Sequence, residues 1–553
     1  MDDDELFGQN LNDSDLKAPI SERNTIKAHL KKAPLKFYLI LIGGILVIII
    51  IILIILLTIS SESKEETPSN EQKNKIAEIN CEYEVGSSQS TILLGKEFNY
   101  EKNNIEIYIN NEKIEYSKEY KFPNYGLYDV NYYLYNDINI NLNNMFKDVS
   151  DLKSVKMITE KNVKLISMIS TFENCEKLET FHISGFDTSQ LNSISKIFYK
   201  TQILHLNLSE IDTSYIEDMS YMFASSKITN EIILNLDIRN AKNLSHMLYN
   251  SDLSDIDLSH FVTNKVEDMS SMFESCHSLT SLDLKSFDTK NVKNMSRMFK
   301  DCVSLKSLNV SSFDTLSVTD MSYMFSDCNY LNQLNLENFD TSEVKNISHM
   351  FSNCNLLSYL KIDKFNTKNV LDMSYLFKAC RSLTNVNFNL FNTSNVEDMS
   401  GMFDSCASLL FLNLAKFDTR NVKNISYMFS DCISLYSLDI TSFITNKVED
   451  MSGIFQDCYS LRTLKFNFDT SNVKNMSYMF YDLSCITSID ISNFNTQNVL
   501  DMSYMFKYMK SLEKINIENF DTSQVINMKS MFENCESLIG IIKFLMFNRI
   551  KFK

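Results

Sequence analysis

The chain of 553 residues contains no tryptophan, only four prolines and only ten glycines. So little glycine argues against a catalytic fold built on glycine-rich loops, and no P-loop, dinucleotide fingerprint, nucleophile elbow or kinase signature is present. The seven histidines are scattered, with none after His349, so no histidine-based triad or metal cluster is predicted. We therefore expect no enzymatic activity and no cofactor.

The chain also lacks an excess of basic residues. Its formal net charge is −17, which disfavours nucleic acid as a partner because phosphate binding requires a basic face. Hydrophobic residues make up 44% of the chain and charged residues 22%, which is near the globular norm. Most of the chain is therefore expected to fold.

A repeat dominates the sequence, and it is clearest from Met272 to Cys276, where Met-Phe precedes two polar residues and a cysteine. The same position recurs at steps of 25 or 26 residues, at Phe146, Phe172, Phe198, Phe223, Leu248, Phe273, Phe299, Phe325, Phe351, Phe377, Phe403, Phe429, Phe455, Phe480, Phe506 and Phe532. A fixed period in this range predicts a stacked-repeat architecture, which we place over residues 141–540.

Each repeat unit divides into two parts. Residues 279–284 match the leucine-rich-repeat strand motif L-x-x-L-x-L, with the leucines on one face and Asp283 on the other. Residues 292–299 carry apolar side chains at three- and four-residue steps, which favours a short helical or 3₁₀ return. We therefore predict an α/β repeat solenoid, with a parallel sheet and short helical returns, preceded by a transmembrane helix and a small all-β domain.

The N-terminal region predicts a membrane anchor. Residues 37–59 are apolar and uncharged, long enough to span a bilayer, and longer than the apolar core of a signal peptide. The tail of residues 1–36, expected to be disordered, ends in a basic run, whereas residues 60–78 form a less basic, flexible stalk. The positive-inside rule then predicts a type II single-pass protein, with a cytoplasmic N-terminus and the repeats outside the cell or in a lumen.

Two further segments flank the repeats. Residues 79–140 alternate in the manner of strands, with a hairpin centred on Asn110-Asn111, and are expected to form a small β domain or an N-terminal cap. Residues 541–553 leave the repeat pattern and are expected to form an irregular basic tail.

The twelve cysteines suggest two alternatives. Ten lie three residues after a register position, at Cys175, Cys276, Cys302, Cys328, Cys354, Cys380, Cys406, Cys432, Cys458 and Cys535, whereas Cys81 and Cys485 lie outside this column. One cysteine per unit favours a column of buried free thiols. Pairing between neighbouring units is the alternative, because adjacent strands lie close enough for a disulfide. A linear column does not offer the converging ligands of a metal site.

An Asp-Thr pair also recurs, for example at Asp288-Thr289 and Asp314-Thr315. Stacked carboxylates could bind calcium. Asn replaces Asp at Asn366, Asn392 and Asn495, however, and Ile444 replaces it entirely. This substitution pattern favours side chains that cap local turns.

The whole unit resembles the 26-residue repeat of the BspA-like leucine-rich-repeat surface-protein family. The matching pieces are FDTSNVKNMSYMF at residues 468–480 and CHSLTSLDL at residues 276–284. The resemblance covers about 400 residues. It implies display on a cell surface and a role in adhesion and in contact with a host or a matrix.

Asn-x-Ser sequons predict glycosylation if the repeats are luminal or extracellular. They occur at Asn207, Asn243, Asn294, Asn309, Asn346, Asn392, Asn424 and Asn475. Four of these, Asn294, Asn346, Asn424 and Asn475, share one repeat position, which also favours a structural role.

Because the core positions repeat, ligand specificity is expected at the outward strand positions that vary. Those with candidate contact side chains are Gln333, Tyr359, Lys361, Phe411, Tyr436 and Arg462. Exposed aromatic residues there fit a protein-contact hot spot, although Phe411 could instead pack on a neighbouring unit. We therefore predict a membrane-anchored surface protein that binds a protein, glycan or matrix ligand; the alternatives are a signalling receptor with a short cytoplasmic tail and a structural coat spacer.

Overall fold

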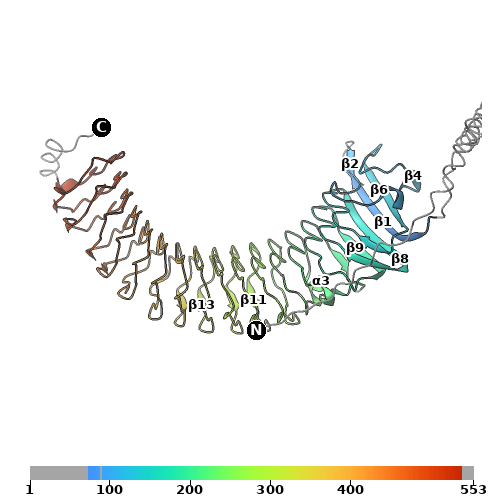
Figure 1. The fold of residues 1–553 in the computed structure, drawn as a ribbon, viewed down its shortest axis with the longest axis horizontal. Helices are drawn as coiled ribbons and strands as arrows, with labels where there is room; N and C mark the ends of the chain where they lie inside the picture. The colour runs from blue at the N-terminus through green and yellow to red at the C-terminus, as the bar shows by residue number, and fades with distance from the viewer. Residues whose placement is uncertain (1–72, 87–89, 209, 539–553) are drawn as a thin grey trace, which may run out of the picture. The chain divides into compact units, whose positions relative to one another are not determined.

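The computed structural model describes residues 73–86, 90–208 and 210–538 (Figure 1). The chain divides into two units, residues 1–73 and residues 74–553, and only the second is described below. The predictions for residues 1–36, 37–59 and 541–553, and for most of the stalk at 60–78, lie outside the described residues.

Within the described ranges, no helix has both the length and the apolarity needed to cross a bilayer. This finding contradicts the expected type II single-pass anchor, and the prediction of a transmembrane helix is not supported.

An N-terminal sheet, antiparallel at its centre, continues directly into the first repeats. Its strand order is β10-β9-β8-β1-β6-β3-β4, with β7 paired to β8. The strands are β1 (Lys75–Val85), β3 (Ile105–Ile109), β4 (Glu112–Ile114), β6 (Gly126–Tyr135), β7 (Asn139–Asn141), β8 (Leu152–Ser167), β9 (Thr180–Asp187) and β10 (His205–Asn207). A second small sheet pairs β2 (Ser90–Ile92) with β5 (Glu119–Lys121). Strand β8 is antiparallel to β1 and parallel to β9, so β1 covers the edge that the first repeat would otherwise expose.

The hairpin predicted at Asn110-Asn111 is confirmed. Ile109 faces Glu112 across it, and the two asparagines have φ of 48° and 70°, as a type I′ turn requires. In the same sheet, the buried hydroxyls of Tyr83 on β1 and Tyr132 on β6 lie 2.8 Å apart.

The repeats lack the helical returns that we expected. In the segment 292–299, the Met298 N–H donates to the Met295 C=O at 3.3 Å, which is the i to i+3 bond of a β-turn. Arg297 has φ of 58°, the left-handed conformation that a type II turn requires at the second of its two central positions. Consecutive turns of this kind also return side chains to the core every three or four residues. The apolar spacing therefore could not distinguish them from a helix.

The other backbone groups form hydrogen bonds from one repeat unit to the next. We call each repeat unit a rung. The Met295 N–H donates to the Asp320 C=O at 3.0 Å, and the Phe299 N–H donates to the Met324 C=O at 2.9 Å. Parallel bridges of this type link residues from Ser193 to Asn527 through about 14 turns, stacked side by side (Figure 1). The fold is thus a β-solenoid with almost no helix, and the α/β prediction is wrong. In the described ranges the helical pieces are η1 (Lys102–Asn104), η2 (Thr213–Tyr215), α3 (Asn230–Leu234) and η3 (Glu536–Leu538).

Short parallel strands mark one side of the stack. They pair as β11 (Ser281–Asp283) with β12 (Ser307–Asn309), β13 (Gln333–Asn335) with β14 (Tyr359–Lys361), β15 (Ser437–Ile440) with β16 (Thr463–Phe466), and β17 (Ser488–Ile489) with β18 (Lys514–Ile515). The register phenylalanines stack through the core; for example, the rings of Phe299 and Phe325 lie 5.6 Å apart at 10°. Each rung therefore packs on its neighbours with the same side chains.

The Asp-Thr pairs cap turns, as predicted. The Asp288 carboxylate and the Asn366 carboxamide each accept a hydrogen bond from the backbone N–H two residues later, at 3.3 Å. The same position also bonds through its backbone to a threonine of the preceding rung. Ile444 does so with the Thr419 hydroxyl, at 2.7 Å from its N–H and 2.9 Å from its C=O. An isoleucine is accepted there because the backbone makes the contact between rungs.

All twelve cysteines are free thiols, and those of the repeat column are buried, as the thiol-column interpretation predicted. Their role goes beyond packing. The Cys302 thiol donates to the Phe273 C=O of the preceding rung at 3.0 Å. In the rung of Leu248, where a serine replaces the cysteine, the Ser251 hydroxyl donates to the Phe223 C=O at 3.1 Å. Leu483 and Met509 fill the same position with buried apolar side chains, so the column holds either a small hydrogen-bond donor or an apolar group.

Tyrosines and histidines form another column, at the left-handed position of the turns. The His349 ring lies 4.3 Å from the Tyr323 ring and 4.8 Å from the Tyr375 ring. Two rungs carry glycine in this column. A Cβ on Gly401 would lie 2.2 Å from the Tyr375 ring, so the glycine leaves room for that ring.

Candidate binding surface

The six predicted contact residues all lie on the strand side of the rungs. Gln333, Tyr359 and Lys361 belong to β13 and β14, Phe411 forms a bridge with Ser437, and Tyr436 and Arg462 directly precede β15 and β16. The leucines of these strands, such as Leu334 and Leu438, point into the core. Alternation along a strand therefore turns Gln333, Tyr359, Lys361 and Phe411 outward. Tyr436 and Arg462 lie before their strands and are exposed as well.

The first three residues form one group. Gln333 pairs with Tyr359 across β13 and β14, and the Tyr359 side chain is 54% exposed. Lys361 forms an ion pair with Glu337 at 2.6 Å, and this hydrogen bond lowers the pKa of Glu337. The charge of Lys361 is therefore partly compensated within the chain.

The other three residues lie together with Leu410, and we call these four residues the aromatic patch. Phe411 is 63% exposed, Leu410 50% and Tyr436 49%. The Tyr436 N–H donates to the Leu410 C=O at 3.2 Å, and the Arg462 N–H donates to the Tyr436 C=O at 3.0 Å. The Arg462 guanidinium lies 5.9 Å from the Tyr436 ring centroid, within reach of a cation–π contact.

The exposure of Phe411 decides between its two interpretations. A side chain that packed on a neighbouring rung would be largely covered, whereas this one is 63% exposed. Arg462 forms no ion pair with any residue in the described ranges. The aromatic patch thus combines the exposed side chains of Leu410, Phe411 and Tyr436 with a cation that has no carboxylate partner among the described residues.

The structure separates the six residues into these two groups. Tyr359 lies two rungs before Phe411, and the exposed Asn385 occupies the rung between them. Two rungs correspond to roughly 10 Å at the usual spacing of strands. Leu410 was missed although it lies in the same column as Tyr436 and Arg462, which were predicted to face outward. The polar residues Asn332 and Ser358 in the same column would have revealed it.

The sequon asparagines lie mostly in structural positions. The side-chain oxygens of Asn243, Asn294, Asn346, Asn424 and Asn475 each accept the N–H of the serine two residues later. Asn309 and Asn392 accept in the same way, and Asn207 belongs to β10. The Asn309 amide nitrogen also donates to the Asp283 carboxylate at 2.9 Å. Glycosylation at these sites stays a prediction.

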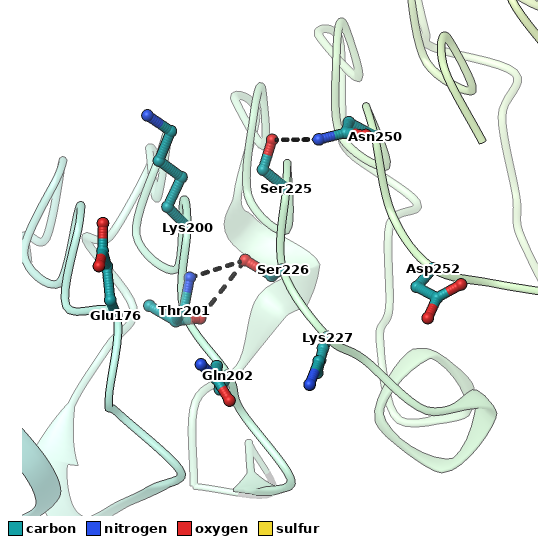
Figure 2. Close-up of a pocket in the computed structure, with 9 residues that line it drawn as sticks. All are labelled: Glu176, Lys200, Thr201, Gln202, Ser225, Ser226, Lys227, Asn250 and Asp252. Atoms are coloured by element: carbon teal, nitrogen blue, oxygen red, sulfur yellow. Dashed lines mark hydrogen bonds between the residues drawn. The ribbon is translucent and has the colours of Figure 1, made fainter. Parts of the chain in front are cut away.

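A polar groove lies between rungs where the thiol column is interrupted (Figure 2). It encloses about 330 Å³ and is lined by Glu176, Lys200, Thr201, Gln202, Ser225, Ser226, Lys227, Asn250 and Asp252. The Ser226 hydroxyl accepts the Thr201 N–H at 3.1 Å, and the Asn250 amide donates to the Ser225 hydroxyl at 3.1 Å (Figure 2). These hydroxyls hold rungs together, and among the described residues none has a basic partner that would make it a nucleophile.

Within the described ranges, no group of three histidine, cysteine, aspartate or glutamate side chains could hold a metal ion. The expectation that the chain is not an enzyme stays a prediction.

Comparison with known proteins places the repeats in a family. The family described as "Mycoplasma protein of unknown function, DUF285" matches residues 166–282, 268–387, 328–434, 371–489 and 463–548. No curated protein matches the chain in sequence.

Two solved structures are similar at low identity. A leucine-rich repeat protein from Bacteroides ovatus ATCC 8483 is 14% identical with a TM-score of 0.33, over 76% of this chain and 83% of that one. The functional domain of InlJ from Listeria monocytogenes, which includes a cysteine ladder, is 15% identical with a TM-score of 0.16, over 64% of this chain and 69% of that one. At these TM-scores neither likeness carries weight for the function.

The family match spans more than half of the chain and coincides with the rungs. It supports a leucine-rich-repeat-like family in general, without singling out the BspA-like proteins. The chain is a leucine-rich-repeat-like solenoid protein, and it belongs to the DUF285 family.

Proposed function

We propose that the chain is a non-catalytic binding protein whose aromatic patch contacts a protein partner. The observation that carries this proposal is the exposure of Phe411 and Tyr436 beside Arg462, which forms no ion pair with a described residue. Protein-contact hot spots are enriched in aromatic residues and arginine, and they form where such side chains become fully desolvated. The patch is also held by backbone bonds between three successive rungs, so binding it costs little ordering entropy.

The resemblance to BspA-like repeats supports a more specific version of this proposal. Adhesion to a host or matrix protein is the role which that resemblance implies. Extended stacks of rungs provide long surfaces of the kind that such binding uses.

The test measures binding of the full chain to a panel of purified matrix proteins and, in parallel, to a glycan array. For a protein that binds, surface plasmon resonance compares the wild type with the variants Phe411→Ala and Tyr436→Ala. A hot-spot residue contributes about 2 kcal/mol or more, which corresponds to roughly 30-fold weaker binding. Tyr330→Ala is the matched control, because Tyr330 is 54% exposed and lies outside the patch.

The proposal requires that both patch variants bind more weakly while the control binds as the wild type does. Unchanged binding by the patch variants would show that another face makes the contact. Binding to glycans alone would replace the protein partner with a carbohydrate. Absence of any binding would favour the spacer alternative.

A further inference from the structure

One pocket lies where the regular stack is interrupted. Most rungs carry a short strand beginning about eight residues after the register position, as Ser281 does after Phe273. In the rung of Phe223 the same place is occupied by α3, residues 230–234. The sheet therefore ends at β10, and α3 lies beside that edge.

The pocket between this sheet edge and α3 has a volume of about 480 Å³. Its lining comes from β8, β9 and β10 and from residues 229–235. Pockets of roughly 300–1,000 Å³ suit small-molecule ligands. Unlike the aromatic patch, this is a concave site, and it lies far along the chain from residues 410–462.

The floor of the pocket carries the outward side chains of three neighbouring strands. Ser154 pairs with Thr180, which pairs with His205, and Lys156 pairs with His182. Between them, Val155 and Phe181 turn into the core. Two imidazoles, an ammonium group and two hydroxyls are therefore presented on one face. Four of these five side chains come from the two long strands β8 and β9, and the fifth, His205, comes from β10.

None of these five side chains forms a hydrogen bond or an ion pair within the described ranges. The adjoining wall adds one carboxylate, Glu231, together with the exposed Leu204 at the rim. The Asn235 amide is already bonded to the Glu231 C=O at 3.0 Å. The free groups of the floor are thus mainly hydrogen-bond donors, and one carries a fixed positive charge.

We propose that this pocket binds a small organic oxyanion, a carboxylate or a phosphate monoester, through Lys156, His182 and His205. Charge-assisted hydrogen bonds from lysine and imidazole to such oxygens are short and strong. The hydroxyls of Ser154 and Thr180 lie in the same floor and supply further donors. Leu204 at the rim covers an apolar part of the ligand. A metal ion is disfavoured because no three potential ligand side chains in the described ranges converge.

The experiment is isothermal titration calorimetry on the full chain with three probes: inorganic phosphate, phenyl phosphate and benzoate. The two organic probes separate the phosphate source from the carboxylate source, and inorganic phosphate shows the gain from the apolar part. We expect saturable binding of at least one organic probe with a stoichiometry of one. Lys156→Ala and His205→Ala each weaken it at least tenfold.

Matched controls are Lys164→Ala, on the same strand as Lys156, and His277→Ala, at an exposed histidine that bonds Asp301 outside the pocket. Both controls bind the probe as the wild type does. The floor side chains are partly or fully exposed, and circular dichroism checks that each variant folds. The proposal is overturned by the absence of saturable binding to all three probes, by binding that Lys156→Ala leaves unchanged, or by zinc binding that His205→Ala abolishes.

Discussion

The Thr289 hydroxyl satisfies two backbone groups of Asp314 on the next rung. It accepts a hydrogen bond from the Asp314 N–H and donates one to the Asp314 C=O, both at 2.8 Å. The threonine side chain is fully buried. Equivalent pairs recur along the stack, so this column of hydroxyls forms a continuous connection between rungs.

Replacing this hydroxyl with a methyl group is expected to destabilise the array. Thr289→Val keeps the shape and removes both hydrogen bonds. An unpaired buried backbone group costs about 1–3 kcal/mol, so we expect a loss of about 2 kcal/mol or more. Urea denaturation followed by circular dichroism measures the difference. Thr289→Ser is the control: it keeps the hydroxyl, loses one methyl and should cost only about 1 kcal/mol. Equal stability of Thr289→Val and the wild type would show that the hydroxyl column is dispensable.

Thiol labelling should distinguish Cys485 from the other eleven cysteines. Cys485 is partly exposed, whereas the other eleven cysteines are buried. Because the thiolate is the reactive form and burial suppresses it, a thiol reagent at pH 8 should label Cys485 rapidly and the others only on unfolding. Mass spectrometry of digested, labelled protein checks which sites react. Labelling of Cys302 or Cys328 at the rate of Cys485 in the folded chain would contradict the buried column.

Because of the same thiols, we expect the protein to lose stability at alkaline pH. Burial raises the pKa of Cys276 and of Cys354 to about 12, from 9.0 in the unfolded chain. The folded state therefore keeps protons that the unfolded state releases. The stabilisation that these protonated thiols give the folded state is fully present below pH 9 and falls as the pH rises towards 12. Thermal unfolding between pH 8 and pH 10.5 should show the decline.

Tyrosine ionisation also contributes in that range, since burial raises the pKa of Tyr83 and Tyr132 as well. The comparison that isolates the thiols uses a Cys302→Ser, Cys328→Ser, Cys354→Ser triple variant, because a serine hydroxyl does not titrate. Its melting temperature should fall less steeply with pH than that of the wild type. Parallel curves for the two proteins would show that the column does not titrate on unfolding.

Gly401 should tolerate no side chain while Tyr375 is present. A Cβ there would lie 2.2 Å from the Tyr375 ring, and the residue has φ of 54°. Gly401→Ala is expected to destabilise the chain by more than the roughly 1–2 kcal/mol that left-handed backbone costs an alanine. In a Tyr375→Ser background, Gly401→Ala should lower the stability only by the cost of placing an alanine in left-handed backbone. Differential scanning calorimetry of the four proteins tests this, and an equal cost in both backgrounds would exclude the ring contact.

Much of the core could be predicted from the sequence because each core position repeats. The register phenylalanines, the thiol column and the capping role of the Asp-Thr pairs are each visible as columns of like residues. The alternation of Leu282 and Asp283 also predicts which strand side chains face outward. Repetition within the chain itself supplies this evidence.

The return half of the rung could not be predicted in this way. Its residues at the left-handed turn positions, such as Arg297 and Tyr323, are not glycines, so the usual signal of such turns is missing. The hydrogen bonds between rungs stabilise these conformations, and that stabilisation depends on neighbours 26 residues away. The pocket beside α3 was missed for a related reason: it exists because one rung departs from the pattern.

The bonds between rungs have a consequence for how such an array changes in length. Among the described residues, each rung bonds to the rung before it and to the rung after it through one repeated set of turn carbonyls, threonine hydroxyl and stacked ring. Excising one complete period joins two partners that already fit each other, whereas excising part of a period shifts every column out of alignment. Unequal recombination in whole periods would thus lengthen or shorten the protein while its fold persists.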